Sequence, residues 1–163
     1  MSEGSGSNYP PPAAFSERAH IGSIEQYQEE YQGIDHGITG LKRRYRCDHF
    51  MAYFQPATNT YAPVDVLRPL YLDALDHPEV VALAIGTRPD CVPDEVLDLL
   101  EEIAGETYLS VEYGIQTSHD KSLDWMNRGH HHDVSVDAIE RSRNRGFEIC
   151  VHVILGLPGE THE

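Results

Sequence analysis

The sequence predicts an α/β fold built on a parallel sheet, and three observations lead to this prediction. Helix-like and strand-like segments alternate along the chain, which is typical of parallel strands joined by right-handed crossovers. Residues 80–85 (VVALAI) form a continuous apolar run, as in a strand that helices cover on both faces or that lines a barrel. Polar segments at residues 86–90, 111–130 and 156–160 each mark the end of a strand, where α/β proteins place ligands.

The first predicted elements are a long helix and a short strand. A helix is expected from Ser23, because apolar residues then recur at steps of three and four. These residues are Ile24, Tyr27, Tyr31, Ile34, Ile38, Leu41 and Tyr45. Residues 49–54 are predicted as a strand and residues 55–61 as a polar loop. The next helix is expected to be firm from Pro69, since a proline in a first turn lacks only an amide proton that would be unpaired anyway.

The later elements repeat the strand–helix pattern. After the strand at 80–85, Asp94 is expected to cap a helix. Its predicted buried stripe is Val96, Leu97, Leu100 and Ile103. Residues 108–113 are predicted as a strand, residues 134–145 as a helix stopped by Gly146, and residues 147–155 as the last strand.

Composition fits one domain with a strongly acidic surface. The chain has 163 residues, 40% hydrophobic content and a net charge of −15, and such a charge repels phosphate backbones at long range. We interpret the charge as a solvated surface that indicates no particular partner. Residues 42–46 (KRRYR) are basic, and their place at a helix end favours an interaction with the helix dipole over a phosphate site.

The lack of a membrane-spanning run or secretory signal and the few, widely spaced cysteines both predict a cytoplasmic protein. No apolar run approaches the roughly 20 residues that cross a bilayer, so no membrane partner is expected. Residues 1–22 lack a secretory signal, and their Gly, Ser and Pro content predicts a flexible segment. Cys47, Cys91 and Cys150 are too widely spaced for a close metal-ligand pattern, and each is interpreted as a small half-buried residue.

Two predicted strand ends carry candidate ligand groups, and each has a plain structural alternative. Gln55, Thr58 and Asn59 follow the first strand and suit an amine or a carboxylate, or else an ordinary polar turn. The segment 87–90 (TRPD) follows the buried second strand. Its arginine and aspartate suit a charged ligand, or else an ion pair that closes the loop.

The third strand and the last strand carry the stronger candidates. Glu112, Gly114 and Gln116 alternate along one strand and are therefore expected on one face, where buried polar groups need partners. A ligand site is favoured over structural hydrogen bonding, because the residues between them are apolar. His152, near the end of the last strand, is also assigned to the site. The run 130–133 (HHHD) is interpreted as solvated histidines with Asp133 as a helix cap rather than a metal site.

Four segments together resemble the radical S-adenosylmethionine (SAM) superfamily, in particular a YhcC-like branch akin to the Elongator catalytic subunit and to oxygen-independent coproporphyrinogen dehydrogenase. They are residues 51–64 (MAYFQPATNTYAPV), 82–100 (ALAIGTRPDCVPDEVLDLL), 111–130 (VEYGIQTSHDKSLDWMNRGH) and 151–161 (VHVILGLPGET). The resemblance implies that residues 23–163 form about four strands of an incomplete (β/α)6 barrel. It also implies an enzyme in which a [4Fe-4S] cluster, supplied with an electron by a donor, cleaves SAM to a 5′-deoxyadenosyl radical that activates a C–H bond.

The resemblance also assigns roles to the strand-end residues. It places the SAM amino group at the loop of Gln55, Thr58 and Asn59, and the methionyl or ribose part beside Thr87, Arg88 and Asp90. It places the ribose and the carboxylate at Gln116 and Arg128, with a further ribose contact from His152. The turn around Gly156 is implied to pack on adenine, and Glu112 completes the expected cofactor-binding set. By analogy with this branch, a substrate in transfer RNA (tRNA) wobble uridine modification is expected.

The cysteines depart from the family pattern. The family's three cluster ligands lie on a loop before the first helix, and no cysteine precedes Ser23 here. The ligands of a [4Fe-4S] cluster are therefore expected to be absent, and the chain alone is expected to be inactive. We interpret it as a fragment of a radical SAM enzyme, with a decayed homologue as the rival origin. The alternative function is a cluster-free SAM-binding or regulatory half-barrel.

Overall fold

A four-stranded parallel sheet forms the centre of the computed structural model, which describes residues 34, 37–45, 47–55 and 58–161. In chain order the elements are β1 (Phe50–Phe54), α2 (Val64–Leu75), β2 (Val80–Thr87), the 3-10 helix η1 (Pro89–Cys91), α3 (Asp94–Ala104), β3 (Tyr108–Gln116), α4 (Asp120–Trp125), α5 (His132–Ser142) and β4 (Glu148–Val153). The strands lie side by side in the order β1-β2-β3-β4, and each pair is parallel. This confirms the predicted α/β class, and the open sheet corresponds to part of a barrel.

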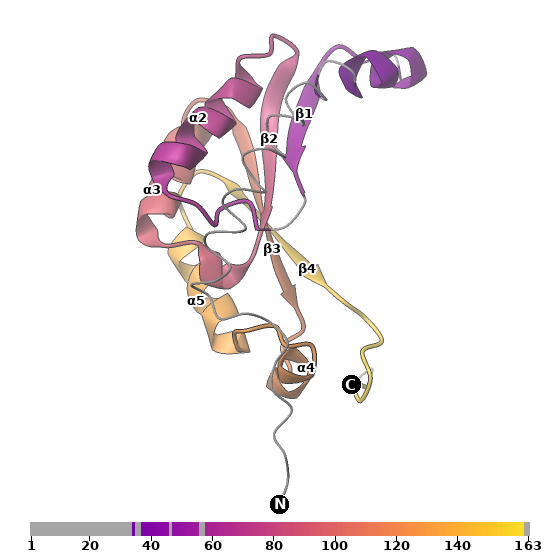
Figure 1. Ribbon diagram of the computed structural model, residues 1–163, viewed down its shortest axis with the longest axis vertical. Helices are drawn as coiled ribbons and strands as arrows, with labels where there is room; N and C mark the ends of the chain where they lie inside the picture. The colour runs from indigo at the N-terminus through magenta and orange to yellow at the C-terminus, as the bar shows by residue number, and fades with distance from the viewer. Residues whose placement is uncertain (1–33, 35–36, 46, 56–57, 162–163) are drawn as a thin grey trace, which may run out of the picture.

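The core lies between one face of the sheet and the helices that cover it. Figure 1 shows α2, α3 and α5 on the same side of the strands. Leu83 and Ile85 of β2 and Val111 of β3 point to that side and are fully buried, as are Leu97 and Leu100 of the predicted α3 stripe. Burial of such side chains contributes roughly 1.5–3 kcal/mol each, so this layer supplies most of the stability.

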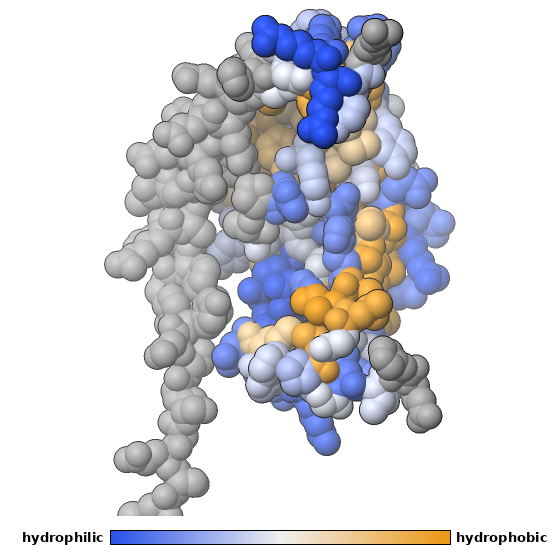
Figure 2. All heavy atoms as spheres, turned by 90° about the vertical axis from the view of Figure 1, so that its right-hand side faces the viewer, coloured by the Kyte–Doolittle hydropathy of each residue, from blue (hydrophilic) through white to orange (hydrophobic). Residues whose placement is uncertain are grey.

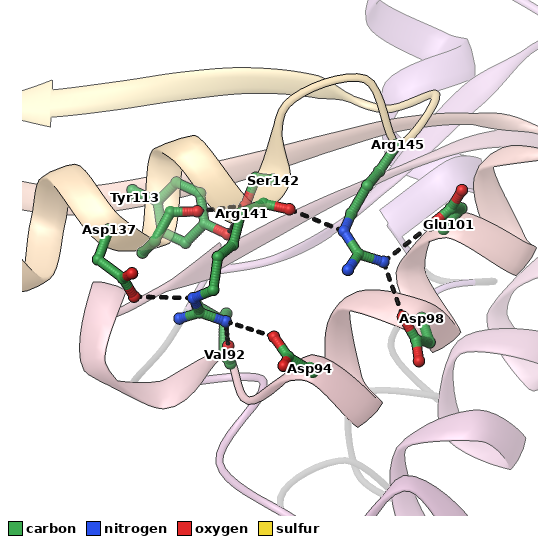
Figure 3. A network of polar contacts seen from close by, with 10 residues as sticks. Val92, Asp94, Asp98, Glu101, Tyr113, Asp137, Arg141, Ser142 and Arg145 are labelled. Carbon is green, nitrogen blue, oxygen red and sulfur yellow. Dashed lines mark hydrogen bonds and ion pairs between the residues drawn. The ribbon is translucent and has the colours of Figure 1, made fainter.

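Two arginines join α3 to the end of α5 on the solvent side of the helix layer. Figure 3 shows Arg141 reaching Asp94 at the start of α3, and Arg145 reaching Asp98 and Glu101 further along it. The Nη1 of Arg145 lies 2.7 Å from Asp98 Oδ1 and 2.8 Å from Glu101 Oε2. Each exposed pair contributes little by itself, but the network fixes how α5 and α3 lie over β3.

Helix α2 begins earlier than predicted, at Val64 rather than near Pro69. Pro63 precedes the first helical residue with a φ of −59°, and its carbonyl accepts the amide protons of Val66 and Leu67. Leu67, two residues before the predicted start, is 2% exposed. Its burial outweighs the hydrogen bond that Pro69 forfeits inside the helix, and the proline itself is exposed.

The predicted ends of the later helices also need correction. Asp94 is the first residue of α3 rather than its cap; the cap position is held by Pro93, and the Asp94 carboxylate instead accepts from Arg141. Helix α5 runs from His132 to Ser142, so it starts two residues earlier and ends three earlier than predicted. Arg143 and the left-handed Asn144 have already left the helix before Gly146.

The N-terminal helix is described only in part. Residue 34 and residues 37–45 are helical, which agrees with the predicted helix over the range that the structure describes. The predicted start at Ser23 and the predicted flexible segment 1–22 lie outside the described residues. Lys42 forms an ion pair with Glu79 just before β2. Among the described residues, no helix is both long and apolar enough to cross a membrane.

Candidate functional site

The face of the sheet opposite the helices carries small and polar side chains. Strand alternation puts Ala84 and Gly86 of β2 on this face, next to Ser110 and Glu112 of β3 in the parallel register. Figure 2 views this side of the molecule and shows hydrophilic side chains beside apolar patches. Parallel sheets are normally covered on both faces, so a face of this composition is where a barrel would enclose a ligand.

The loop after β1 is fastened to the end of β2 by a buried amide. Asn59 is 1% exposed, and its Nδ2 donates to the carbonyl oxygens of Phe54 at 2.7 Å and Gly86 at 2.9 Å. A Cβ at Gly86 would lie 3.3 Å from the Phe54 carbonyl oxygen, so glycine allows the loop to approach. The Asn59 side chain therefore holds two strand ends together. Gln55 is exposed directly after β1, and Thr58 is half-buried.

A second set of buried hydrogen bonds connects the same loop to the segment after β2. The Thr60 hydroxyl lies 2.5 Å from the Thr87 hydroxyl and donates to the Cys91 carbonyl oxygen at 2.5 Å. Thr60 and Thr87 are 2% and 6% exposed. Because these contacts are buried and mutually satisfied, they fix the positions of Arg88 and Asp90, which follow on the surface of the open end.

Arg88 and Asp90 form a bidentate ion pair beside a buried histidine. Arg88 Nε lies 2.9 Å from Asp90 Oδ1, and its Nη2 lies 2.6 Å from Oδ2. Burial disfavours the Asp90 carboxylate, but the hydrogen bonds and charge of Arg88 outweigh it and lower the pKa of Asp90 below its ordinary value. His130 Nε2 lies 3.9 Å from Asp90 Oδ1, and the His130 side chain is only 2% exposed.

Gln116 and Arg128 meet over Gly114. A Cβ built on Gly114 would lie 2.9 Å from Gln116 Nε2 and 3.2 Å from Arg128 Nη2, so only glycine leaves room for both side-chain ends. The register shifts between Gly114 and Gln116, and Gln116 has a left-handed φ of 68°. This bulge at the strand end turns the Gln116 side chain back over the open face, and such strained positions concentrate at functional sites.

The guanidinium of Arg128 uses only part of its hydrogen-bonding capacity. Its Nη2 donates to the Gly114 carbonyl oxygen, but its buried Nε has no hydrogen-bond partner in the described part of the chain. Burial and the nearby cation of Arg88 lower the pKa of Arg128 from its ordinary value. A buried guanidinium with an open donor beside a second cation favours an anionic ligand, and a carboxylate has the matching geometry.

A second polar group lies on the same face, nearer the middle of the strands. Glu112 Oε2 accepts from the Tyr53 hydroxyl at 2.7 Å and lies 2.8 Å from His152 Nε2. The hydrogen bond to Glu112, burial and the charge of Glu112 raise the pKa of Tyr53 to about 12. Cys150 Sγ lies 3.8 Å from His152 Nε2. Strands β1, β3 and β4 thus contribute to one cluster, with the Tyr53 side chain reaching across β2.

The structure brings the predicted site residues together in two sets. The first set lies at the strand ends and contains Thr87, Arg88, Asp90, Gln116 and Arg128. The second set, in the middle of the open face, contains Glu112 and His152. Gly156 lies in the turn after β4 with a left-handed φ of 83°. The amide of Ile154 donates to the Gln116 carbonyl oxygen at 2.8 Å, which ties that turn to the end of β3.

The sequence-based prediction did not include three residues that contribute to the site. Tyr53 and Cys150 belong to the Glu112 cluster, and His130 faces Asp90. Strand parity was an available signal for the first two. Tyr53 alternates with the core residue Phe54, and Cys150 is two positions before His152, so each lies on the open face. Nothing in the sequence separated His130 from its two neighbouring histidines.

The histidine run at 130–132 does not have the predicted arrangement. Its first member, His130, is buried rather than solvated, and His131 rather than Asp133 holds the cap position of α5. His131 Nε2 lies 2.9 Å from Asp124 Oδ1, and the hydrogen bond to Asp124 raises the pKa of His131. The amide proton of His132 is accepted by Asp120 of α4, so a residue distant in sequence performs the capping.

The three cysteines lie apart and in different surroundings. Cys91 is buried, Cys47 is half-buried and Cys150 is exposed, so only Cys47 matches the half-buried environment predicted for all three. The described residues contain one group of three close metal-type side chains, Glu112, Cys150 and His152, and it includes a single thiol. This arrangement does not fit a [4Fe-4S] cluster, which needs three or four thiolates around one centre.

Comparison with known proteins gives consistent results. The family model of the radical SAM superfamily matches residues 34–163. The protein YhcC of Escherichia coli strain K12 is 47% identical over 116 residues, which cover 71% of this chain and 38% of that protein. The tRNA uridine(34) acetyltransferase of Methanocaldococcus jannaschii is 34% identical over 84 residues, covering 51% of this chain and 15% of that protein.

A solved structure shares the fold. Methanocaldococcus infernus Elp3, in a form with an N-terminal deletion of residues 1–46, superposes with a TM-score of 0.63 at 18% identity. The match covers 76% of this chain and 33% of that one. The chain therefore spans well under half the length of YhcC and of Elp3.

Proposed function

Because this chain belongs to the radical SAM superfamily, we propose that the strand-end set of its open sheet face binds S-adenosylmethionine. The observation that carries the proposal is the buried Nε of Arg128, which has no hydrogen-bond partner among the described residues and lies beside Gln116 and Arg88. The α-carboxylate of SAM would accept a hydrogen bond from the Arg128 Nε. The ribose hydroxyls of SAM would bind the side-chain amide of Gln116. The open donor and the positive charge of Arg128 support this assignment.

Each strand end contributes one kind of contact in this proposal. Arg128 holds the carboxylate through its Nε, and Gln116 binds a ribose hydroxyl above Gly114. Arg88, kept in place by Asp90, adds positive potential without direct contact. Gln55 and Thr58 offer oxygens to the amino group, while Asn59 holds their loop against β2.

The remaining predicted site residues complete the proposed pocket. Thr87 supports the segment after β2 through its bond to Thr60. Glu112 and His152 form the floor of the pocket, and the turn at Gly156 lies where adenine would pack. The contacts that hold Asn59, Thr87 and Asp90 are present before SAM arrives, whereas the buried Nε of Arg128 has to be uncovered for the carboxylate to reach it.

Titration of SAM into the purified chain by calorimetry tests the proposal. We expect saturable binding without added iron. Arg128→Gln removes one charge-assisted hydrogen bond worth about 1.5–3 kcal/mol and should weaken SAM binding roughly 10- to 150-fold. The exposed Arg143→Gln is the matched control and should change nothing. 5′-Methylthioadenosine lacks the carboxylate, so Arg128→Gln should leave its affinity unchanged. The proposal is wrong if Arg128→Gln weakens the binding of both ligands equally, or if the wild-type chain does not bind SAM.

The radical chemistry of the family is proposed only for a protein that supplies further thiolates. In the family, the cluster supplies the electron that cleaves SAM. The three cysteines of this chain do not form that ligand set, so this chain's own contribution is to bind and orient SAM. Free, unpaired cysteines in small number agree with a cytoplasmic location.

A tRNA substrate is proposed for the whole protein. The support is the similarity to a tRNA uridine(34) acetyltransferase. The net charge of −15 opposes binding of phosphate by this chain alone. A gel-shift titration with total tRNA should therefore show weak, salt-sensitive binding by the chain, and tight binding that resists salt would show that this chain itself carries the RNA site.

A further inference from the structure

We propose that Glu112, Cys150 and His152 form a binding site for a divalent transition-metal ion, with Zn²⁺ as the best-matched ion. One carboxylate oxygen, one thiol sulfur and one imidazole nitrogen lie within 4.8 Å of one another on the open face of the sheet. This inference goes beyond the SAM pocket: Glu112 and His152 also line that pocket in the proposal above, whereas Cys150 belongs to the metal site alone.

The strands bring the three residues together by register. Glu112 of β3 and Cys150 of β4 are direct partners in the parallel pair, and His152 is two positions further on the same face. Two ligands from one strand at i and i+2, with a third from the next strand, converge on a point above the sheet. Because regular strands hold all three backbones, the site is built before an ion arrives.

The distance between Cys150 and His152 agrees with that between two ligands of a small tetrahedral ion. Zn–S and Zn–N bonds of about 2.3 and 2.1 Å place the two ligand atoms about 3.6 Å apart. Cys150 Sγ and His152 Nε2 lie 3.8 Å apart. Glu112 Oε2 and His152 Nε2 are 2.8 Å apart, which is a hydrogen-bond distance and shorter than the separation of two ligands on one ion. Binding would replace this hydrogen bond with two metal bonds, release the thiol proton, and move the two atoms about 0.5 Å apart.

The surroundings also suit a metal. The Tyr53 hydroxyl donates to Glu112 Oε2 at 2.7 Å, the kind of outer hydrogen bond that orients a ligating carboxylate. The Glu112 side chain is 17% exposed, whereas His152 is 52% exposed, so the carboxylate is anchored and the imidazole can adjust. The exposed side leaves a fourth position open to water. A mixed sulfur, nitrogen and oxygen set favours Zn²⁺ over Mg²⁺ or Ca²⁺, which take oxygen ligands.

Cobalt titration of the purified, reduced chain tests the site directly. Co²⁺ substitutes for Zn²⁺ and reports thiolate ligation through a sulfur-to-metal charge-transfer band and visible d–d bands. We expect one equivalent of Co²⁺ to produce both, and one equivalent of Zn²⁺ to abolish both. Cys150→Ser should eliminate the charge-transfer band. Glu112→Gln and His152→Ala should each weaken Co²⁺ binding by about 10-fold or more.

Matched variants separate this site from other cysteines and histidines. Cys47→Ser and His131→Ala should keep both the bands and the affinity. Cys150 is exposed, so Cys150→Ser should fold normally by circular dichroism. The proposal is wrong if the wild-type chain shows no saturable thiolate band, or if Cys150→Ser keeps the band or Cys47→Ser loses it.

The metal site and the SAM pocket can fail independently. Arg128→Gln should weaken SAM binding and leave the Co²⁺ bands unchanged. Cys150→Ser should do the reverse. Loss of Co²⁺ binding in Arg128→Gln would show that the two sets of residues form a single site and would overturn the proposal.

Discussion

Replacing Gly114 with alanine tests how the two polar side chains share space above β3. The added methyl carbon would lie 2.9 Å from Gln116 Nε2 and 3.2 Å from Arg128 Nη2, both shorter than an ordinary van der Waals contact. The third neighbour, the Thr87 carbonyl oxygen, lies 3.7 Å away and causes no clash. Since only the ends of two flexible side chains are in the way, they move and the backbone stays.

The expected effect on binding follows from the contacts that would be lost. Displacing Gln116 removes one neutral hydrogen bond of about 1 kcal/mol, and displacing Arg128 removes one charge-assisted bond of about 1.5–3 kcal/mol. The sum of about 2.5–4 kcal/mol corresponds to SAM binding roughly 70- to 900-fold weaker. The fold itself should not suffer, because alanine stabilises a strand by roughly 0.5–1 kcal/mol relative to glycine.

The assay pairs SAM calorimetry with urea unfolding on the same preparations. Gly40→Ala is the matched control, because a Cβ there meets nothing within 4 Å. It should stabilise the helix at residues 37–45 slightly and leave SAM affinity unchanged. The reasoning is refuted if Gly114→Ala binds SAM like the wild type, or if it loses more than about 2 kcal/mol of unfolding free energy, which would indicate a structural role.

Two further predictions concern titratable groups. Burial raises the pKa of Cys91 to about 12, so iodoacetamide near neutral pH should label the exposed Cys150 quickly and Cys91 only after unfolding, as read by mass spectrometry. Equal labelling rates for the two would contradict the structure. Asp90 is held ionised by Arg88 and has a lowered pKa in the folded state, so its stabilising contribution is complete above the ordinary value of 3.8 and is lost as pH falls through the folded-state pKa. The difference in unfolding free energy between wild type and Asp90→Asn should therefore be largest near neutral pH and shrink in acid; a difference that grows in acid would reverse the sign of the reasoning.

The sequence predicted the fold class and the core because both depend on local periodicity. The stripe containing Leu97 and Leu100 lies where a helix with 3.6 residues per turn places it, and the run at 80–85 became a buried strand. The start of α2 was wrong because a local rule for Pro69 was given more weight than the tertiary burial of Leu67, which the sequence does not state.

The site was predictable by location but not by arrangement. Strand ends pointed to Arg88, Gln116 and Arg128, yet the convergence over Gly114 depends on a bulge and a left-handed residue that no local pattern indicates. The contact of Cys150 with the Glu112 cluster depends on the register between β3 and β4. Register is set by packing of the whole sheet, so residues distant in sequence meet in ways that spacing alone does not give.

The most direct test of the SAM pocket is the NMR signal of the Arg128 Nε–H group. In a ¹H–¹⁵N spectrum of the arginine side chains, this signal is identified by its absence from Arg128→Gln. Saturating SAM should shift it strongly, because the carboxylate takes up the open donor, whereas 5′-methylthioadenosine should leave it nearly in place and Arg143 should not respond to either. An Arg128 signal that stays unchanged at saturating SAM, or that shifts equally with both ligands, would contradict the assignment of this residue to the carboxylate.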